Sequence, residues 1–284
     1  MSITDYGRFV KFEHTIFALP FVLATIAIYS LEEEIELFNV ILIIFVLVAA
    51  RSTAFGLNRI IDRDIDARNL RTRDRELITG KISLRNAKNF IILNALLFLI
   101  ISASFNYITM ACAPILLFFF ILYPFLKRFT WLCHFVLGFI IGVSPIATWL
   151  ALAGRVSLSS YLLSLGVMAW IAGFDILYSL LDIEFDKKEK LYSFPVCFGV
   201  KNSLLISGIL HIFTLIFLFF SFSGPFYLTG MGVMTIILVY EHLIVRPDDL
   251  SKVNMAFFNV NGVASIIFFV FTFLEVLSRS NFKL

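Results

Sequence analysis

The chain has 284 residues, of which 60% are hydrophobic and only 15% are charged, and its mean hydropathy is +0.94. Soluble globular domains carry about 25% charged residues, so this composition excludes a soluble domain and indicates a polytopic membrane protein. The net charge of +3 gives no indication of nucleic-acid binding, and we expect no nucleic-acid partner.

Nine apolar runs have about the 20 residues that a membrane-spanning helix needs. In chain order they are Thr15–Leu31, Leu37–Leu57, Ala87–Phe105, Tyr107–Phe125, Trp131–Ala153, Ser159–Leu181, Leu204–Phe222, Pro225–Leu243 and Met255–Leu277. Backbone polar groups in lipid must be hydrogen-bonded within the span, so we predict an all-α fold. No cleavage site follows the first run, which indicates a retained helix rather than a signal peptide. We expect one transmembrane domain over residues 1–284.

The basic residues indicate the orientation. Nineteen of the 23 Lys and Arg residues lie in the N-terminal segment and in the loops around residues 58–86, 126–130, 182–203 and 244–254. Three lie on the other side, and Arg51 lies within the second span. Loops rich in Lys and Arg stay in the cytoplasm. We therefore expect a multi-pass protein of the cell (inner) membrane, with these loops facing the cytoplasm.

Two acidic clusters stand at the cytoplasmic ends of spans. Asn58, Asp62 and Asp66 are spaced four residues apart, as are Asp182 and Asp186. This spacing places each cluster on one face of a helix, where carboxylates repel one another unless a cation joins them. Mg²⁺ takes one or two carboxylates and fills its other positions with water and substrate phosphate. The clusters therefore predict a magnesium site that binds a diphosphate.

The alternative is that both clusters are solvated helix ends. The same four-residue spacing occurs twice, four spans apart. In both cases the row of polar residues on one helix face continues into the apolar span. Both observations favour the metal site. The repetition also predicts an internal duplication, with halves at about residues 1–126 and 127–250 followed by a ninth helix. Gly138 and Gly142 form a G-x-x-x-G pattern that is typical of helix packing.

Two charged residues lie deeper in the spans, in line with the clusters. Arg51 precedes Asn58 by seven residues, and Asp175 precedes Asp182 by seven, with Tyr178 between. Charges at this depth usually face a polar cavity. Arg51 either pairs with a buried Asp such as Asp175 or binds a substrate carboxylate. Asp175 either is that structural partner or orients or deprotonates a substrate.

Basic residues follow the first cluster and the fourth span. Arg71, Arg73 and Arg75 lie just beyond Asp66, and Lys127 and Arg128 follow the fourth span. Membrane topology alone predicts basic residues here. Their density beside an acidic metal site is better explained if a diphosphate lies between them. The neighbouring charges are expected to be ordinary solvated loop residues: Arg59, Arg63, Asp64, Glu184 and Lys187.

Six motifs together resemble the UbiA family of intramembrane aromatic prenyltransferases. They are H-T-I-F-A-L-P-F (14–21), N-R-I-I-D-R-D-I-D (58–66), R-T-R-D-R-E-L (71–77), Y-P-F-L-K-R-F-T (123–130), D-I-L-Y-S-L-L-D-I-E-F-D (175–186) and A-F-F-N-V-N-G (256–262). They cover most of the chain in the right order. One departure is Asn58-Arg59, where the family often has Asn-Asp.

The resemblance implies nine helices around a central cavity open to lipid, and Mg²⁺-dependent transfer of a polyprenyl group from its diphosphate to an aromatic ring. The implied metal ligands are Asn58, Asp62, Asp66, Asp182 and Asp186. The implied diphosphate-binding residues are Arg71, Arg75, Lys127 and Tyr123. Arg51 would meet the acceptor carboxylate, and Asp175 and Tyr178 would line the pocket near the ring.

The resemblance favours 4-hydroxybenzoate as acceptor, in ubiquinone-type quinone biosynthesis. A dihydroxynaphthoate of menaquinone biosynthesis is the alternative, since Arg51 would bind either carboxylate. Outside the class, a transporter or channel would also place charges within the membrane, but it predicts mid-membrane charges and discontinuous spans. A phosphatidyltransferase would place its aspartates at one helix end, without a second cluster.

Overall fold

The computed structural model describes residues 3–280, which contain helices and loops but no β-strand. The first half contains α1 (Ile3–Phe9), the 3₁₀ helix η1 (Phe12–Phe17), α2 (Leu19–Tyr29), α3 (Leu37–Ile61), α4 (Arg63–Arg68), α5 (Leu84–Phe105) and α6 (Tyr107–Leu126). The second half contains α7 (Cys133–Gly142), α8 (Ser144–Ala153), α9 (Leu158–Ser179), the 3₁₀ helix η2 (Leu180–Asp182), α10 (Ile183–Lys188), α11 (Phe194–Ser221), α12 (Pro225–Ile244), α13 (Val253–Met255), the π-helix η3 (Ala256–Val260) and α14 (Asn261–Arg279).

The prediction of an all-α protein with nine spans is confirmed. Within residues 3–280, nine helical segments are long and apolar enough to cross a membrane, and each coincides with one predicted run. The second and sixth segments extend further than predicted, to Ile61 and Lys188, so that they reach the acidic clusters. Large apolar side chains such as Ile100, Phe118 and Ile236 are exposed on the outer helix faces, where lipid would cover them.

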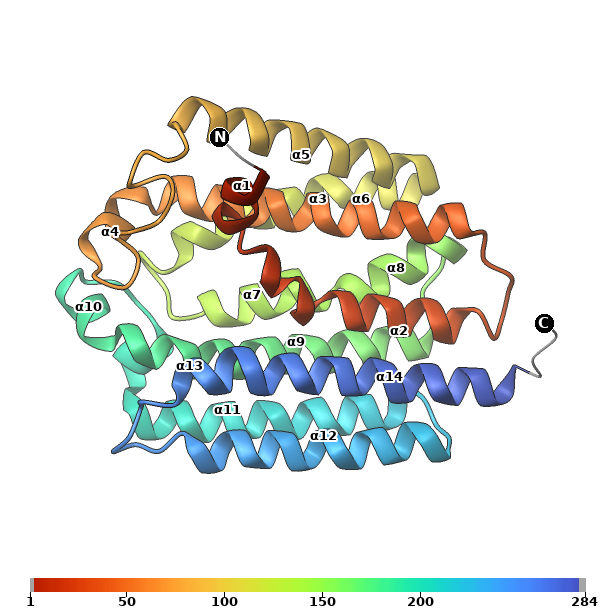
Figure 1. Ribbon diagram of the computed structural model, residues 1–284. Helices are drawn as coiled ribbons and strands as arrows, with labels where there is room; N and C mark the ends of the chain where they lie inside the picture. The colour runs from red at the N-terminus through yellow and green to blue at the C-terminus, as the bar shows by residue number, and fades with distance from the viewer. Residues whose placement is uncertain (1–2, 281–284) are drawn as a thin grey trace.

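Figure 1 shows the long helices lying side by side, with α5 at one edge of the bundle and α12 at the other. Helix α9 lies in the middle and packs against α7 on one side and α11 on the other. The short helices α4, α10 and α13 gather at one end of the bundle. The two acidic clusters are therefore at the same end, as their spacing predicted.

The main apolar core surrounds α9. Trp149, Trp170 and Phe268 are almost completely buried there, and Phe21 of α2 stacks on Phe268 with ring centroids 4.9 Å apart. The core therefore ties α2, α8 and α14 to the central helix. This packing holds α9 rigidly, and α9 carries the second acidic cluster at its end.

The fifth predicted span is one segment in sequence but two helices in space. Helix α7 ends at Gly142, and α8 begins at Ser144. Pro145 lacks an N–H and its ring blocks the preceding turn, which breaks a helix. The amide of Ile146 would bond to Gly142 in a continuous helix, but it donates to Ser164 Oγ of α9 at 3.0 Å. A discontinuous span is therefore present, although we had expected such spans only of a transporter.

The G-x-x-x-G pattern does pack helices closely, as predicted. A Cβ at Gly138 would lie 2.5 Å from the Met168 carbonyl oxygen, and one at Gly142 would lie 2.5 Å from the Met168 backbone nitrogen. Real Cβ atoms do not approach backbone this closely, so any larger residue has to push α7 away from α9.

We therefore expect Gly142→Ala to destabilise the protein by about 1–3 kcal/mol, the usual cost of overpacking. The measurement is the midpoint of thermal unfolding in detergent. Gly232→Ala on α12 is the matched control, because a Cβ there meets nothing within 4 Å. Equal midpoints for both variants would contradict the assignment of Gly142 as a packing residue.

Candidate active site

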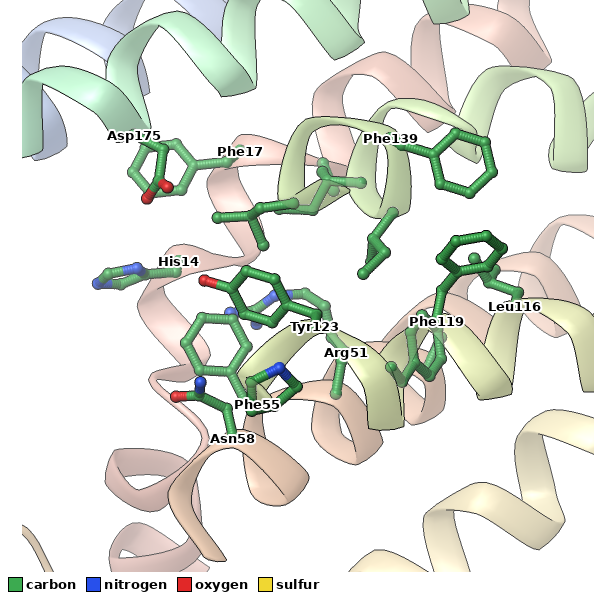
Figure 2. A pocket seen from close by; sticks show the side chains of 18 of the residues that line it. His14, Phe17, Arg51, Phe55, Asn58, Leu116, Phe119, Tyr123, Phe139 and Asp175 are labelled. Carbon is green, nitrogen blue, oxygen red and sulfur yellow. The ribbon is translucent and has the colours of Figure 1, made fainter. Parts of the chain in front are cut away.

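One cavity of about 580 Å³ lies between the helices of the two halves. Its polar end is formed by the acidic clusters, and its apolar end by residues such as Phe105, Leu116 and Leu150. Figure 2 shows Arg51, Asn58, Tyr123 and Asp175 around one space with several phenylalanine side chains. Cys112 and Ile115 line the cavity and are exposed on α6, so the cavity reaches the surface that faces lipid.

The structure brings every predicted site residue to this cavity. They are Arg51, Asn58, Asp62, Asp66, Arg71, Arg75, Tyr123, Lys127, Asp175, Tyr178, Asp182 and Asp186. Their chemical roles remain predictions. Their convergence from both halves of the chain was the expected consequence of placing both clusters at one end of the bundle.

The prediction that each cluster lies on a single regular helix is wrong at one residue in each half. Helix α3 ends at Ile61 and α4 begins at Arg63, so Asp62 lies at a break with φ −94° and ψ 4°. Asp182 lies at a similar break, with φ −108° and ψ 5°. The bond from the Asp66 amide to the Asp62 carbonyl persists at 2.8 Å. The chain therefore bends without losing the four-residue register.

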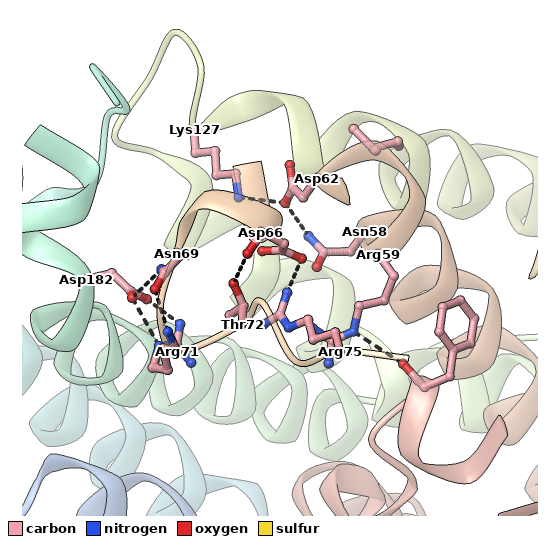
Figure 3. A network of polar contacts seen from close by, with 12 residues as sticks. Asn58, Arg59, Asp62, Asp66, Asn69, Arg71, Thr72, Arg75, Lys127 and Asp182 are labelled. Carbon is pink, nitrogen blue, oxygen red and sulfur yellow. Dashed lines mark hydrogen bonds and ion pairs between the residues drawn. The ribbon is translucent and has the colours of Figure 1, made fainter. Parts of the chain in front are cut away.

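Asp62 is the most enclosed of these carboxylates, with a side chain 2% exposed. It forms ion pairs with Lys127 at 2.6 Å and with Arg128 at 3.1 Å, and it accepts a hydrogen bond from Asn58 Nδ2 at 3.1 Å. Figure 3 shows the contacts of Lys127 and Asn58 with this carboxylate. Burial raises the pKa of the Asp62 carboxyl, while Lys127 and Arg128 favour the charged form. The ionised carboxylate therefore depends on nearby positive charge.

Asp66 and Asp182 are also paired with basic residues. Asp66 forms an ion pair with Arg75, and Asp182 forms one with Arg71. Asn69 Nδ2 donates to Asp182 at 3.0 Å, which links the loop after the first cluster to the second cluster (Figure 3). Arg71 also donates to the Tyr178 hydroxyl at 2.6 Å. The loop after the first cluster thus folds over the second.

The donor atoms fit a divalent cation. Four carboxylates and the amide oxygen of Asn58 converge on one end of the cavity, and Mg²⁺ prefers oxygen ligands of this kind. Asp186 makes no ion pair within residues 3–280. The guanidinium and ammonium groups that now neutralise the carboxylates are of the kind that binds phosphate oxygens.

Arg51 and Asp175 do not pair with each other, so the structural alternative for these residues is wrong. Arg51 donates to Thr15 Oγ1 at 2.6 Å and to the Lys11 carbonyl at 3.0 Å, and its guanidinium lies 4.6 Å from the Phe55 ring centroid. It makes no ion pair with any residue in the described range 3–280. A positive charge without a carboxylate partner therefore faces the cavity.

Asp175 is paired instead with His134, which the sequence interpretation missed. His134 Nδ1 lies 2.7 Å from Asp175 Oδ2, and His134 Nε2 accepts a hydrogen bond from the Phe194 amide at 3.2 Å. Because Nε2 accepts, the proton of a neutral ring is on Nδ1 and is donated to Asp175. A lone histidine inside an apolar span is itself a signal of function, and it was available in the sequence.

Arg59 is also not the solvated loop residue that we expected. Its side chain is buried, and its Nε donates to the Phe9 carbonyl at 3.3 Å, which ties the N-terminal helix α1 to α3. Arg63, Asp64, Glu184 and Lys187 are exposed, as predicted.

The model of the UbiA prenyltransferase family matches residues 18–263. The chain belongs to this family. It is therefore a multi-pass membrane protein and a prenyltransferase, which sets aside the transporter and phosphatidyltransferase alternatives.

Individual members of the family match over nearly the full length. The chain is 29% identical over 279 residues to the 4-hydroxybenzoate octaprenyltransferase of Histophilus somni, covering 96% of this chain and 97% of that one. It is 28% identical to the structure of a UbiA homologue from Aeropyrum pernix, with a TM-score of 0.83 over 93% of this chain and 98% of that one. A UbiA homologue from Archaeoglobus fulgidus, solved with GPP and Mg²⁺, has a TM-score of 0.71 over 96% of this chain and 99% of that one, and at 19% identity this shows the fold alone.

Proposed function

We propose that the protein transfers a polyprenyl group from polyprenyl diphosphate to the ring of 4-hydroxybenzoate, with Mg²⁺ as cofactor. The observation that carries the proposal is the cavity itself. Its acidic end, lined by oxygen ligands and basic residues, suits a charged head group. Arg51, which has no ion-pair partner within residues 3–280, suits an aromatic acid, and the apolar remainder suits a lipid tail.

The ion pairs at the acidic end of the cavity support its assignment as the diphosphate-binding end. With Mg²⁺ and diphosphate bound, the carboxylates of Asp62, Asp66 and Asp182 would hold the metal. Their present partners Arg71, Arg75 and Lys127 would then bind the phosphate oxygens, so that every charge stays neutralised. Tyr123 lines the same cavity (Figure 2).

Arg51 supports the assignment of the acceptor-binding part of the cavity. Its planar guanidinium binds a carboxylate through two parallel hydrogen bonds, and Thr15 and Phe55 hold it in place. 4-Hydroxybenzoate would place its carboxylate there and its ring towards Asp175 and Tyr178. A dihydroxynaphthoate has the same carboxylate, so it is the second candidate acceptor.

In the reaction, the bond between the allylic C1 of the donor and the diphosphate oxygen breaks, while C1 bonds to the ring carbon ortho to the hydroxyl. Mg²⁺ supplies Lewis-acid stabilisation of the leaving diphosphate. Arg71, Arg75 and Lys127 neutralise the charge that develops on it. Aromatic rings around the cavity, including Phe257 stacked on Tyr178 at 3.9 Å, stabilise the cationic carbon and exclude water. We assign the displaced ring proton to Asp175, which His134 orients.

The polyprenyl tail would lie in the apolar end of the cavity and leave towards lipid beside Cys112 and Ile115. We further propose that the acidic end faces the cytoplasm, because the basic loops cluster at the same end of the bundle. Water-soluble aromatic acid would then enter from the cytoplasm, while the donor enters from the bilayer.

The test uses membranes that contain the protein, radiolabelled polyprenyl diphosphate and either 4-hydroxybenzoate or a dihydroxynaphthoate. We expect Mg²⁺-dependent labelling of 4-hydroxybenzoate, and its loss after chelation with EDTA and return with Mg²⁺. Membranes of the same host without the protein are the control. Labelling of the dihydroxynaphthoate alone would replace the first acceptor with the second. Labelling that survives chelation would contradict the metal assignment.

A further inference from the structure

A second group of polar side chains is buried far from the cavity. His211 of α11 lies against Glu241 and His242 of α12, and none of the three lines the cavity described above. Figure 1 shows α11 and α12 on the opposite side of α9 from α7, which lines the cavity. The proposed prenyl transfer gives these residues no role.

The three side chains present one ligand atom each to a common point. His211 Nδ1 lies 2.9 Å from His242 Nε2 and 3.5 Å from Glu241 Oε2, and all three atoms lie within 4.8 Å of one another. In a tetrahedral zinc site with metal–nitrogen bonds of about 2.1 Å, neighbouring ligand atoms are about 3.4 Å apart. The two printed spacings, 2.9 and 3.5 Å, are therefore within about 0.5 Å of the spacing in such a site.

The carboxylate needs a positive charge. Glu241 is 0% exposed, and its Oε2 has no hydrogen-bond partner among the described residues. Its only ion-pairing partner there is His211, whose Nδ1 is shared with His242. Burying a carboxylate without a counter-charge is costly, so a cation or a proton must neutralise it.

The surroundings orient the ligands. Asn261 Nδ2 donates to Glu241 Oε1 at 2.6 Å and to the Ala256 carbonyl at 2.9 Å, which leaves Oε2 turned towards the histidines. The π-helix η3 places Asn261 at this point, and π-turns often occur at functional sites. A hydrogen bond of this kind to the second oxygen of a carboxylate is usual around metal sites.

The packing of His211 against α9 fixes the orientation of the His211 ring. A Cβ at Gly173 would come within 2.6 Å of His211 Nε2, so only glycine leaves room for the ring. The ring therefore presents Nδ1, and not Nε2, to Glu241 and His242.

We propose that His211, Glu241 and His242 bind a transition-metal ion of the Zn²⁺ class that joins α11 to α12. Two imidazole nitrogens and one carboxylate oxygen suit Zn²⁺ and disfavour Mg²⁺, which prefers oxygen alone. Three protein ligands leave one position for water. This site is distinct from the diphosphate site, and it would stabilise the helix pair at the edge of the bundle.

The test measures metal content directly and needs no activity. Purified protein in detergent is incubated with Zn²⁺, dialysed and analysed by mass spectrometry for zinc per chain. The background protein carries Asp66→Asn and Asp182→Asn, so that the diphosphate site does not bind zinc and add to the measured zinc content. We expect about one zinc per chain in this background, falling at least tenfold on adding either Glu241→Gln or His242→Ala.

Ser207→Ala is the matched control. Ser207 lies one turn from His211 on α11, is fully buried and donates to the Gly173 carbonyl at 2.9 Å, but offers no ligand to the cluster. This variant should keep its zinc. Co²⁺ absorption spectra of the same proteins give a second readout, with ligand-field bands expected in the background protein and the Ser207 variant only.

Absence of zinc from the background protein would overturn the proposal and leave a protonated Glu241 in a hydrogen-bonded cluster. Zinc that persists in both the Glu241 and the His242 variants would overturn it as well. If Glu241→Gln does not elute as a folded protein, the His242 variant still decides, because His242 is only partly buried.

Discussion

Replacement of Asp182 by asparagine should lower kcat/KM for prenyl transfer by about a thousandfold, the scale on which loss of a charge-stabilising group acts. Asp182 is paired with Arg71 and accepts a hydrogen bond from Asn69. Asparagine keeps the size of the side chain but loses the charge that would bind the metal and position Arg71. The measurement is steady-state transfer to 4-hydroxybenzoate at saturating Mg²⁺.

Glu184→Gln is the matched control for this prediction. Glu184 lies two residues further along the same segment, but its side chain is 88% exposed and forms an ion pair with Lys187. Removing its charge should leave kcat/KM unchanged. Near wild-type turnover in the Asp182 variant, with the protein folded, would refute the assignment of this carboxylate to the metal.

Arg51→Gln should raise the KM for 4-hydroxybenzoate at least about thirtyfold, since loss of one partner of a buried charge pair costs about 2 kcal/mol or more. The KM for the polyprenyl diphosphate should change little, because Arg51 lies deeper than the residues assigned to the diphosphate. The measurement compares the acid with its methyl ester as acceptors. The wild type should strongly prefer the acid, and the variant should not.

Thr15→Val controls for the local structure around Arg51. It removes the hydrogen bond from Arg51 at 2.6 Å but leaves the positive charge in the cavity. Its preference for the acid over the ester should persist. An unchanged preference in the Arg51 variant would mean that the acceptor carboxylate binds elsewhere.

Sequence patterns predicted the fold well, because membrane spans are local. Each of the nine spans is an apolar run of sufficient length, and lipid forces such runs into helices. The break between α7 and α8 was missed although Pro145 lies within the run. Its consequence depends on Ser164 of a different helix, which accepts the freed amide of Ile146. Ser164 is brought next to Ile146 only by tertiary packing, so the sequence of the fifth span alone does not predict this hydrogen bond.

The sequence predicted which residues line the cavity, but not which of their side chains pair with each other. The four-residue spacing of the aspartates placed them together, since register along a helix is a local property. The partner of Asp175 was not predictable in this way. Arg51 and His134 lie on different helices, and their positions around Asp175 are set by packing. The burial of Arg59 under α1 has the same origin, because Phe9 is 50 residues away in sequence.

Under the proposed function, the ion pairs at the acidic end would also make binding of Mg²⁺ and binding of the diphosphate interdependent. Mg²⁺ arriving alone would have to displace Lys127, Arg71 and Arg75 from the carboxylates and would leave their charges facing it. A diphosphate arriving alone would draw the same cations away and leave the carboxylates unneutralised. Each ligand therefore provides the counter-charges that the other removes, so each raises the affinity for the other by the same factor. If the proposed site binds both ligands, the resting protein should respond little to free metal and should bind metal and lipid diphosphate together.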